Sequence, residues 1–224
     1  MPLSEKFYQS FVAGQTYHVI FKANTGRNLF LSDENKRYFQ KKIRLYLSPF
    51  VLIRSFNLLD NHVHLIIEIH SEKRLRKTLR QIPSENLVKT MKDFLNGFAT
   101  VHELITRQIS RLLIGYAIAL NNQQGTVGHL FHRKFRRILI DNEVYLSQVI
   151  LYVHANPVHH RLTKRIEKYR WSSFYQLIRG APDLSDNDWL IQWFGGMAAL
   201  LNSHQKYLNQ IIRYPQNRFG FQGE

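Results

Sequence analysis

The sequence predicts an α+β protein: a ferredoxin-like antiparallel sheet with helices packed on one face, followed by a helical C-terminal appendage. Strand-like segments, rich in β-branched and aromatic residues, and helix-like segments follow one another in the order β-α-β-β-α-β-α. A short polar turn separates the second and third strand-like segments, which indicates an antiparallel hairpin. The chain has no internal repeat and no long Gly/Ser linker, so one sheet is expected to organise most of it.

The first strand, the first helix and the hairpin each carry local signals. Residues 16–23 are rich in aromatic and β-branched side chains and predict a strand. Ser32 is an expected N-cap for a helix that ends before Pro49. The apolar run that follows is broken only by a polar turn, and it predicts two buried strands at 51–58 and 62–69.

The second half of the chain alternates in the same way. Residues 72–124 predict two or three helices, and residues 129–140 predict a basic strand. The next helix is expected over 143–156, because Pro157 lacks an amide hydrogen and disfavours helix in the residue before it. The chain after this helix is first rich in basic and aromatic residues, and its last part is predicted to be helical.

The charge of the chain restricts its partners. Lys and Arg number 31 against 16 Asp and Glu, which gives a net charge of +15. A polyanion is favoured as partner, because each neutralised phosphate releases counterions; the alternative is a basic surface without a specific partner. The absence of Cys excludes disulfides, thiolate catalysis and Cys-based zinc sites.

No segment indicates a membrane. No apolar run approaches the roughly 20 residues that span a bilayer. The N-terminal residues lack the basic-then-apolar order of a signal peptide. We therefore expect a soluble, cytoplasmic protein that has no membrane partner.

His62 and His64 form a His-x-His pair in the second strand of the hairpin. Residues at i and i+2 of a strand point to the same face, about 6–7 Å apart, so the two imidazoles can hold one metal ion while Val63 packs into the opposite layer. The alternative is an ordinary pair of surface or core histidines, since the chain contains 11 His. Two ligands do not complete a metal site, so a third has to come from elsewhere.

Tyr152 and Asn156 lie four residues apart in the predicted helix and therefore share one of its faces. An amide oxygen is a hard ligand that suits Mg²⁺ or Mn²⁺ better than zinc. The alternative reading is a core tyrosine and an asparagine that stops the helix before a proline.

Together these segments resemble the single-tyrosine HUH transposases, and more closely the REP-associated tyrosine transposases and related bacterial insertion-sequence transposases. Five stretches between residues 14 and 175 carry the resemblance in the expected order: Gly14-Gln15-Thr16-Tyr17-His18-Val19, Asn61-His62-Val63-His64-Leu65-Ile66, Gly128-His129-Leu130-Phe131-His132-Arg133-Lys134-Phe135, Tyr152-Val153-His154-Ala155-Asn156-Pro157-Val158 and Tyr169-Arg170-Trp171-Ser172-Ser173.

The resemblance implies the HUH endonuclease fold and a metal-dependent enzyme that nicks and joins single-stranded DNA, often beside a hairpin. His62, His64 and Asn156 would hold Mg²⁺ or Mn²⁺, and Tyr152 would be the nucleophile that forms a 5′-phosphotyrosine intermediate. The catalytic set would be Tyr152, His62 and His64. No nucleotide cofactor is expected, because the phosphotyrosyl ester conserves the energy of the bond it replaces. A monomer with its site in cis is favoured over a dimer that exchanges tyrosine helices.

Two groups of basic residues are candidates for DNA binding. One precedes the tyrosine helix, and its alternative role is a solvated edge strand protected by its charge. The other lies in the helical region after the histidine strand, and its alternative role is a soluble helix surface. The candidates are Arg133, Lys134, Arg136, Arg137, Lys73 and Arg74.

The expected organisation is a catalytic domain over residues 1–175, with a helical insertion at about 70–125, and a helical extension over 176–224. Two other functions are compatible with the residues. The first is a non-catalytic nucleic-acid-binding protein on the same fold. The second is a metal-dependent hydrolase that uses water in place of the tyrosine.

Overall fold

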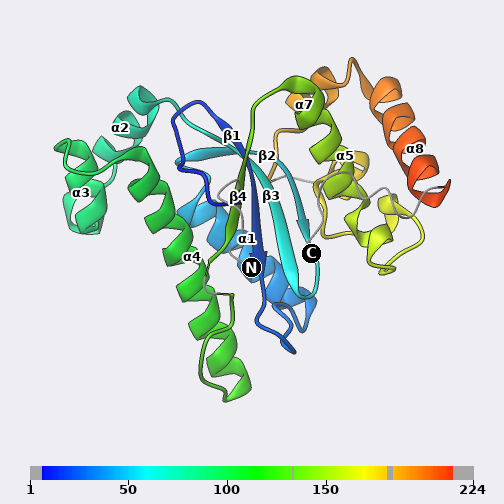
Figure 1. The fold of residues 1–224 in the computed structure, drawn as a ribbon. Coiled ribbons are helices and arrows are strands. Elements are labelled where there is room, and N and C mark those ends of the chain that lie inside the picture. Colours follow the sequence, from blue (N-terminus) through cyan, green and yellow to red (C-terminus); the bar gives the residue numbers. More distant parts are fainter. Residues whose placement is uncertain (1–6, 133, 181–183, 214–224) are drawn as a thin grey trace.

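The protein is built around a four-stranded antiparallel sheet with the order β2-β3-β1-β4 (Figure 1). The computed structural model describes residues 7–132, 134–180 and 184–213. The predicted α+β class and antiparallel sheet are confirmed. The strands are β1 (Thr16–Lys22), β2 (Val51–Leu58), β3 (His62–Ile69) and β4 (Arg136–Ile140).

Helices cover both faces of the sheet. On one face, α1 (Asp33–Tyr46) and α4 (Val101–Gln124) pack against inward side chains of β1 and β3, including Tyr17 and Leu65. On the other face, α5 (Glu143–His159) packs against Ile66 of β3 (Figure 1). The prediction of helices on one face therefore holds for α1 and α4, and α5 forms a second layer. The reason lies in β3, which is buried on both of its faces.

Shorter helices complete the two layers. On the first side, α2 (Glu72–Arg80) and α3 (Lys89–Leu95) lead into α4, with a 3₁₀ turn between them. On the other side, the last described helices follow α5, and α8 packs on α5 through Leu200 and Tyr207 (Figure 1). These helices are α6 (Ser173–Arg179), α7 (Asn187–Trp193) and α8 (Met197–Arg213). Within the described part of the chain, no helix has the length and apolar character needed to cross a bilayer.

The basic strand is shorter than its pattern predicts. Ladder pairing with β1 begins at Arg136, whereas the prediction began at residue 129. The preceding segment follows the end of β1 through separate contacts: Asn24 N–H donates to the Leu130 carbonyl at 2.9 Å, and His132 N–H to the Lys22 carbonyl at 2.8 Å. The reason is a change of register: the ladder stops at the Ile20–Arg136 pair, and the next bridge, Ala23–Phe131, is offset from it by two residues.

Helix α5 continues through Pro157 to His159, so the predicted stop at residue 156 is wrong. A proline inside a helix removes one hydrogen bond, here to the carbonyl of Val153, four residues earlier. Asn57 of β2 replaces it, because its Nδ2 donates to the Val153 carbonyl at 2.8 Å. The sheet thus supplies the donor that the helix lacks, and the helix can extend by another turn.

Candidate active site

His62 and His64 share the face of β3 that α5 covers. Their ring centroids are 4.9 Å apart, and the two side chains are 5% and 0% exposed. Val63 belongs to the core on the opposite face of the sheet. The strand alternation predicted this arrangement, and it places two imidazoles against one helix.

Helix α5 lays a row of polar side chains along the histidine pair. The Tyr152 ring lies 5.8 Å from the His64 ring, centroid to centroid, with the two planes perpendicular. Two turns later, the His160 ring lies 4.7 Å from the His62 ring. Asn156 is one turn from each of these contacts and is fully buried. The helix therefore brings Tyr152 to the histidine pair within a single chain, and Asn156 lies on the helix between the Tyr152 and His160 contacts.

The Nδ1 atom of each histidine is held by a hydrogen bond. His62 Nδ1 lies 2.6 Å from Asn61 Oδ1, and because an amide oxygen only accepts, Nδ1 carries the proton. In the neutral ring Nε2 then carries a free lone pair. This tautomer can bind a metal ion through Nε2. His64 Nδ1 lies 2.9 Å from Nε2 of the fully buried His18. Any coordination by the pair would therefore use Nε2.

Burial keeps the His64 ring neutral. Desolvation holds the pKa of His64 well below its usual range, and the neighbouring His62 and His160 lower it further. A neutral imidazole suits a metal ligand, since a protonated ring has no lone pair to donate.

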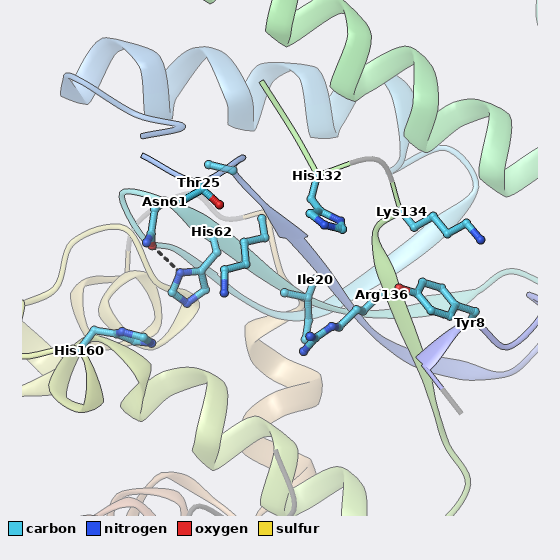
Figure 2. A pocket seen from close by; sticks show the side chains of 11 residues that line it. Tyr8, Ile20, Thr25, Asn61, His62, His132, Lys134, Arg136 and His160 are labelled. Atoms are coloured by element: carbon cyan, nitrogen blue, oxygen red, sulfur yellow. Dashed lines mark hydrogen bonds between the residues drawn. The ribbon is translucent and has the colours of Figure 1, made fainter. Parts of the chain in front are cut away.

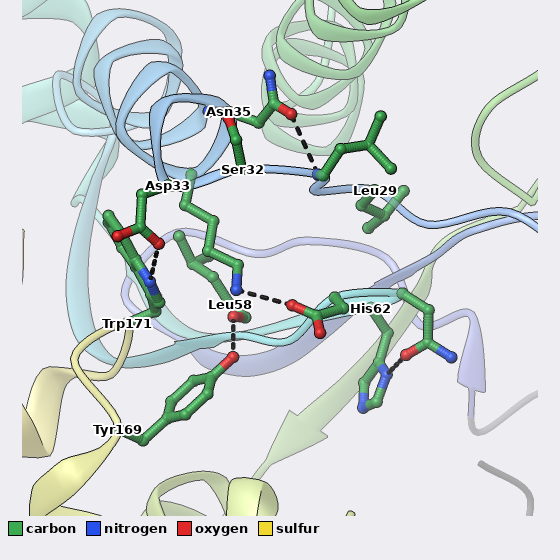
Figure 3. A network of polar contacts seen from close by, with 12 residues as sticks. Leu29, Ser32, Asp33, Asn35, Leu58, His62, Tyr169 and Trp171 are labelled. Carbon is green, nitrogen blue, oxygen red and sulfur yellow. Dashed lines mark hydrogen bonds and ion pairs between the residues drawn. The ribbon is translucent and has the colours of Figure 1, made fainter. Parts of the chain in front are cut away.

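A polar network fixes the turn that carries Asn61 (Figure 3). Lys36 Nζ contacts Asp60 Oδ1 at 2.7 Å, and the backbone N–H of Leu29 donates to the Asp60 carbonyl at 2.7 Å. The Asn61 carbonyl accepts from Ala23 N–H at 2.8 Å. The amide that orients His62 is thus positioned by α1 and by the segment after β1.

Asn156 fits the role of a third ligand. Its Oδ1 and Nδ2 are both buried, and neither has a hydrogen-bond partner among the described residues. A buried amide in this state is costly, and a cation at Oδ1 would relieve part of that cost. No three His, Asp or Glu side chains of the described chain form a metal site by themselves. An ion held by His62 and His64 therefore requires an amide or another ligand type.

A basic cavity of about 560 Å³ opens beside His62 (Figure 2). His62 and His160 line one end, and Lys134 and Arg136 line the other; the remaining lining residues are Tyr8, Ile20, Lys22, Ala23, Thr25, Asn61 and His132. No carboxylate lines it among the described residues. The cationic side chains and the absence of a carboxylate among the described lining residues favour an anionic ligand in this cavity.

Three of the other DNA-binding candidates lie away from this cavity. Arg137 points to the opposite face of the sheet, where its Nε donates to the Gln9 carbonyl at 2.6 Å. Arg133 lies outside the described residues. Lys73 and Arg74 belong to α2, which follows the far end of β3 from His62, so the fold does not bring them to the cavity.

A second network of buried hydrogen bonds holds α5 in place. His204 Nδ1 lies 2.8 Å from the Leu200 carbonyl, so it donates, and its Nε2 accepts from His154 Nδ1 at 2.8 Å. His154 Nε2 then accepts a hydroxyl proton from Ser173 or Ser55, at 2.7 and 2.9 Å. The network joins α5 to β2, α6 and α8, and it identifies His154 as a packing residue.

Sequence reasoning missed several residues of the site. His18 and His160 touch the histidine pair, and Asn61 orients it. The alternation of β1 puts His18 opposite the core residues Tyr17 and Val19, but its proximity to His64 depends on the pairing of β1 with β3. That pairing crosses a helix and a strand, and no local pattern fixes it.

A scan against protein-family models and a search of curated proteins both find no match. The chain is similar to a solved structure of a REP-associated tyrosine transposase bound to a REP hairpin, with 16% sequence identity and a TM-score of 0.49. The similarity covers 82% of this chain and 91% of that chain. At this identity and TM-score it carries no argument about function, which has to rest on the residues of the site.

Proposed function

We propose that this protein is a divalent-metal-dependent endonuclease and strand transferase of the HUH tyrosine transposase type, with single-stranded DNA as its substrate. One observation carries the proposal: the Tyr152 ring of α5 lies 5.8 Å from His64 of the His-x-His pair, in the same chain. A non-catalytic binder on this sheet would have no need for that approach. The hairpin beside the cleavage site is an expectation from the sequence resemblance.

His62, His64 and Asn156 would hold the ion, either Mg²⁺ or Mn²⁺. When bound, it would polarise the scissile phosphate and offset the charge that develops in the transition state. Lys134 and Arg136 would place the DNA backbone, because they line the cavity beside His62. The buried contacts of α5 would hold Tyr152 at the phosphate, which reduces the entropic part of the barrier.

The reaction follows from a phenol as nucleophile. Tyr152 Oη attacks the phosphorus, its proton is lost, and the bond to the 3′ oxygen breaks as that oxygen takes up a proton. The products are a 5′-phosphotyrosyl link and a free 3′ hydroxyl. A 3′ hydroxyl from a second strand reverses the step and joins the strands, so no nucleotide cofactor is required.

The test is a denaturing gel with labelled single-stranded hairpin DNA and Mn²⁺, comparing wild type, Tyr152→Phe and Tyr145→Phe. Tyr145 is a matched control, because it lies on the same helix and outside the catalytic set. A covalent protein–DNA band is expected for wild type and Tyr145→Phe, only with metal, and not for Tyr152→Phe. Cleavage that persists in Tyr152→Phe without a band would indicate a hydrolase that uses water. Tight binding with neither band nor cleavage would indicate a non-catalytic binding protein.

We also propose that one chain forms a complete site in cis as a monomer. The contact of Tyr152 with His64 within one chain supports this. Sedimentation is expected to give the mass of a single chain, and a stable dimer would contradict it.

A further inference from the structure

A second cavity, of about 830 Å³, adjoins the basic cavity between α4 and the segment that leads into β4. We call it the α4 groove. One wall is the face of α4 that carries Ile114 and Ile118, and the other wall includes Phe131 and Phe135. The function proposed above does not use this groove.

The α4 wall exposes apolar surface. Ile114 and Ile118 are each 56% exposed and lie one helical turn apart, so they form one apolar strip. Phe131 and Phe135 face the same space and are half-buried. An exposed apolar and aromatic surface of this kind indicates a binding site.

The groove borders the basic cavity across the segment before β4, on the opposite face of the sheet. Tyr8, His132 and Lys134 line both of them. Lys134 Nζ lies 5.7 Å from the centre of the Tyr8 ring, so a cation and an aromatic ring stand together at the junction. A DNA strand in the basic cavity would bend around Lys134 at this junction and bring its next nucleotides to the α4 groove.

The charge of the groove identifies its occupant. Among the described lining residues none is Asp or Glu, whereas Lys134 and Arg137 are cationic. The whole chain carries +15, so a second copy of it would meet like charge at this surface. A polyanion with apolar faces, which a single strand of nucleic acid is, matches both properties.

We propose that the α4 groove binds nucleobases of the DNA strand whose backbone occupies the basic cavity. This inference rests on the proposed function. The bases would leave their neighbours and stack on the isoleucine and phenylalanine side chains, while Lys134 holds the backbone. Base stacking on protein side chains is sequence-tolerant, so the groove would add affinity for single strands over duplexes without reading a particular sequence.

The experiment separates bases from backbone. Fluorescence anisotropy would compare an oligothymidylate of about 20 nucleotides with an abasic strand of equal length and charge. The protein would carry Tyr152→Phe, so that no cleavage occurs. The groove variant is Ile114→Ser with Ile118→Ser, both at exposed positions. The control is Leu45→Ser on α1, where the side chain is 61% exposed and outside the groove.

We expect the parent protein and the control to prefer oligothymidylate over the abasic strand by about tenfold. The groove variant should lose this preference and keep its affinity for the abasic strand, because the basic cavity is intact. Equal preference in the groove variant and the parent would overturn the inference. So would a dimer of the parent that the groove variant abolishes, since the occupant would then be a second copy.

The two proposals can fail separately. If the parent protein binds neither strand, DNA binding is wrong and both proposals fall. If it binds both strands equally, the groove proposal falls while the catalytic proposal stands. If the base preference is present and the covalent band of wild type is absent, the groove stands and the transposase chemistry falls.

Discussion

Asn57 of β2 donates a hydrogen bond from Nδ2 to the Val153 carbonyl of α5 across 2.8 Å. Asn57 is paired with His64 in the sheet, and Val153 directly follows Tyr152. The bond therefore links the residue beside the metal-ligand candidate to the residue beside the nucleophile candidate. Pro157 makes it possible, because it leaves this carbonyl without its helical donor.

Replacing Asn57 by Leu should leave a buried carbonyl without a donor and lower the free energy of unfolding by about 1–3 kcal/mol. Pro157→Ala restores a helical amide hydrogen for that carbonyl. Asn57→Leu should therefore lower the free energy of unfolding less in the Pro157→Ala protein than in wild type. Urea unfolding of the four proteins in this cycle measures the coupling. Strict additivity would show that Pro157 and Asn57 do not act on the same carbonyl.

Asn156→Leu should separate stability from activity. It removes two buried polar atoms that have no hydrogen-bond partner in the described part of the chain, so the metal-free protein is expected to unfold at equal or higher urea concentration. The Mn²⁺-dependent covalent band should disappear, and Mn²⁺ binding measured by calorimetry should weaken. A large loss of stability in the absence of metal would instead assign Asn156 a purely structural role. Wild type treated with a chelator should lose the band and recover it with Mn²⁺.

The stability of the fold should depend on pH through His204. Burial lowers the pKa of His204 to about 4, and the hydrogen bond to the Leu200 backbone opposes part of this shift. The unfolded chain, with a pKa near 6.5, then binds the proton more readily than the folded chain. The free energy of unfolding therefore has its full value above about pH 6.5, where His204 is neutral in both states. It decreases by about 3 kcal/mol as the pH falls towards 4. Burial lowers the pKa of His154 in the same direction.

Urea unfolding between pH 7.5 and 4.5 measures this dependence, with His204→Gln as the comparison. Gln can still accept the hydrogen bond from His154 but does not titrate. The unfolding free energy of His204→Gln should therefore fall less steeply with decreasing pH than that of wild type. Parallel curves for the two proteins would exclude His204 as a source of the dependence.

The salt dependence of DNA binding should distinguish the two basic groups. Lys134→Ala and Arg136→Ala are each expected to lower the slope of log K against log salt by about 0.7 for an unstructured single strand. Lys73→Ala and Arg74→Ala should lower it only for a strand that carries a hairpin, because α2 lies away from the basic cavity. Anisotropy titrations at several salt concentrations provide the slopes. If Arg136→Ala has the same slope as wild type, Arg136 does not contact the DNA backbone.

The sequence was sufficient where local chemistry decides the structure. The bounds of β2 and β3 were predicted to the residue, because an apolar run on both sides of a polar turn has one hairpin solution. The same alternation placed His62 and His64 on one face. The spacing of Tyr152 and Asn156 placed both on one face of a helix.

Long-range contacts decided the features that the sequence did not reveal. The continuation of α5 through Pro157 depends on a donor from β2, far away in the chain. The second helical layer depends on which face of β3 receives α5. His18 and His160 approach the histidine pair only after β1 and α5 have docked. Each of these contacts joins elements whose pairing has no local sequence signal.

The order of the elements along the chain has a consequence during translation. The histidine strand leaves the ribosome before Tyr152, and His204, whose hydrogen bond to His154 holds the tyrosine helix, leaves after both. A nascent or prematurely terminated chain thus carries the metal-ligand candidates without an anchored nucleophile. On the proposed function, synthesis itself would therefore delay the capacity to cut DNA until the chain has been made at least as far as α8.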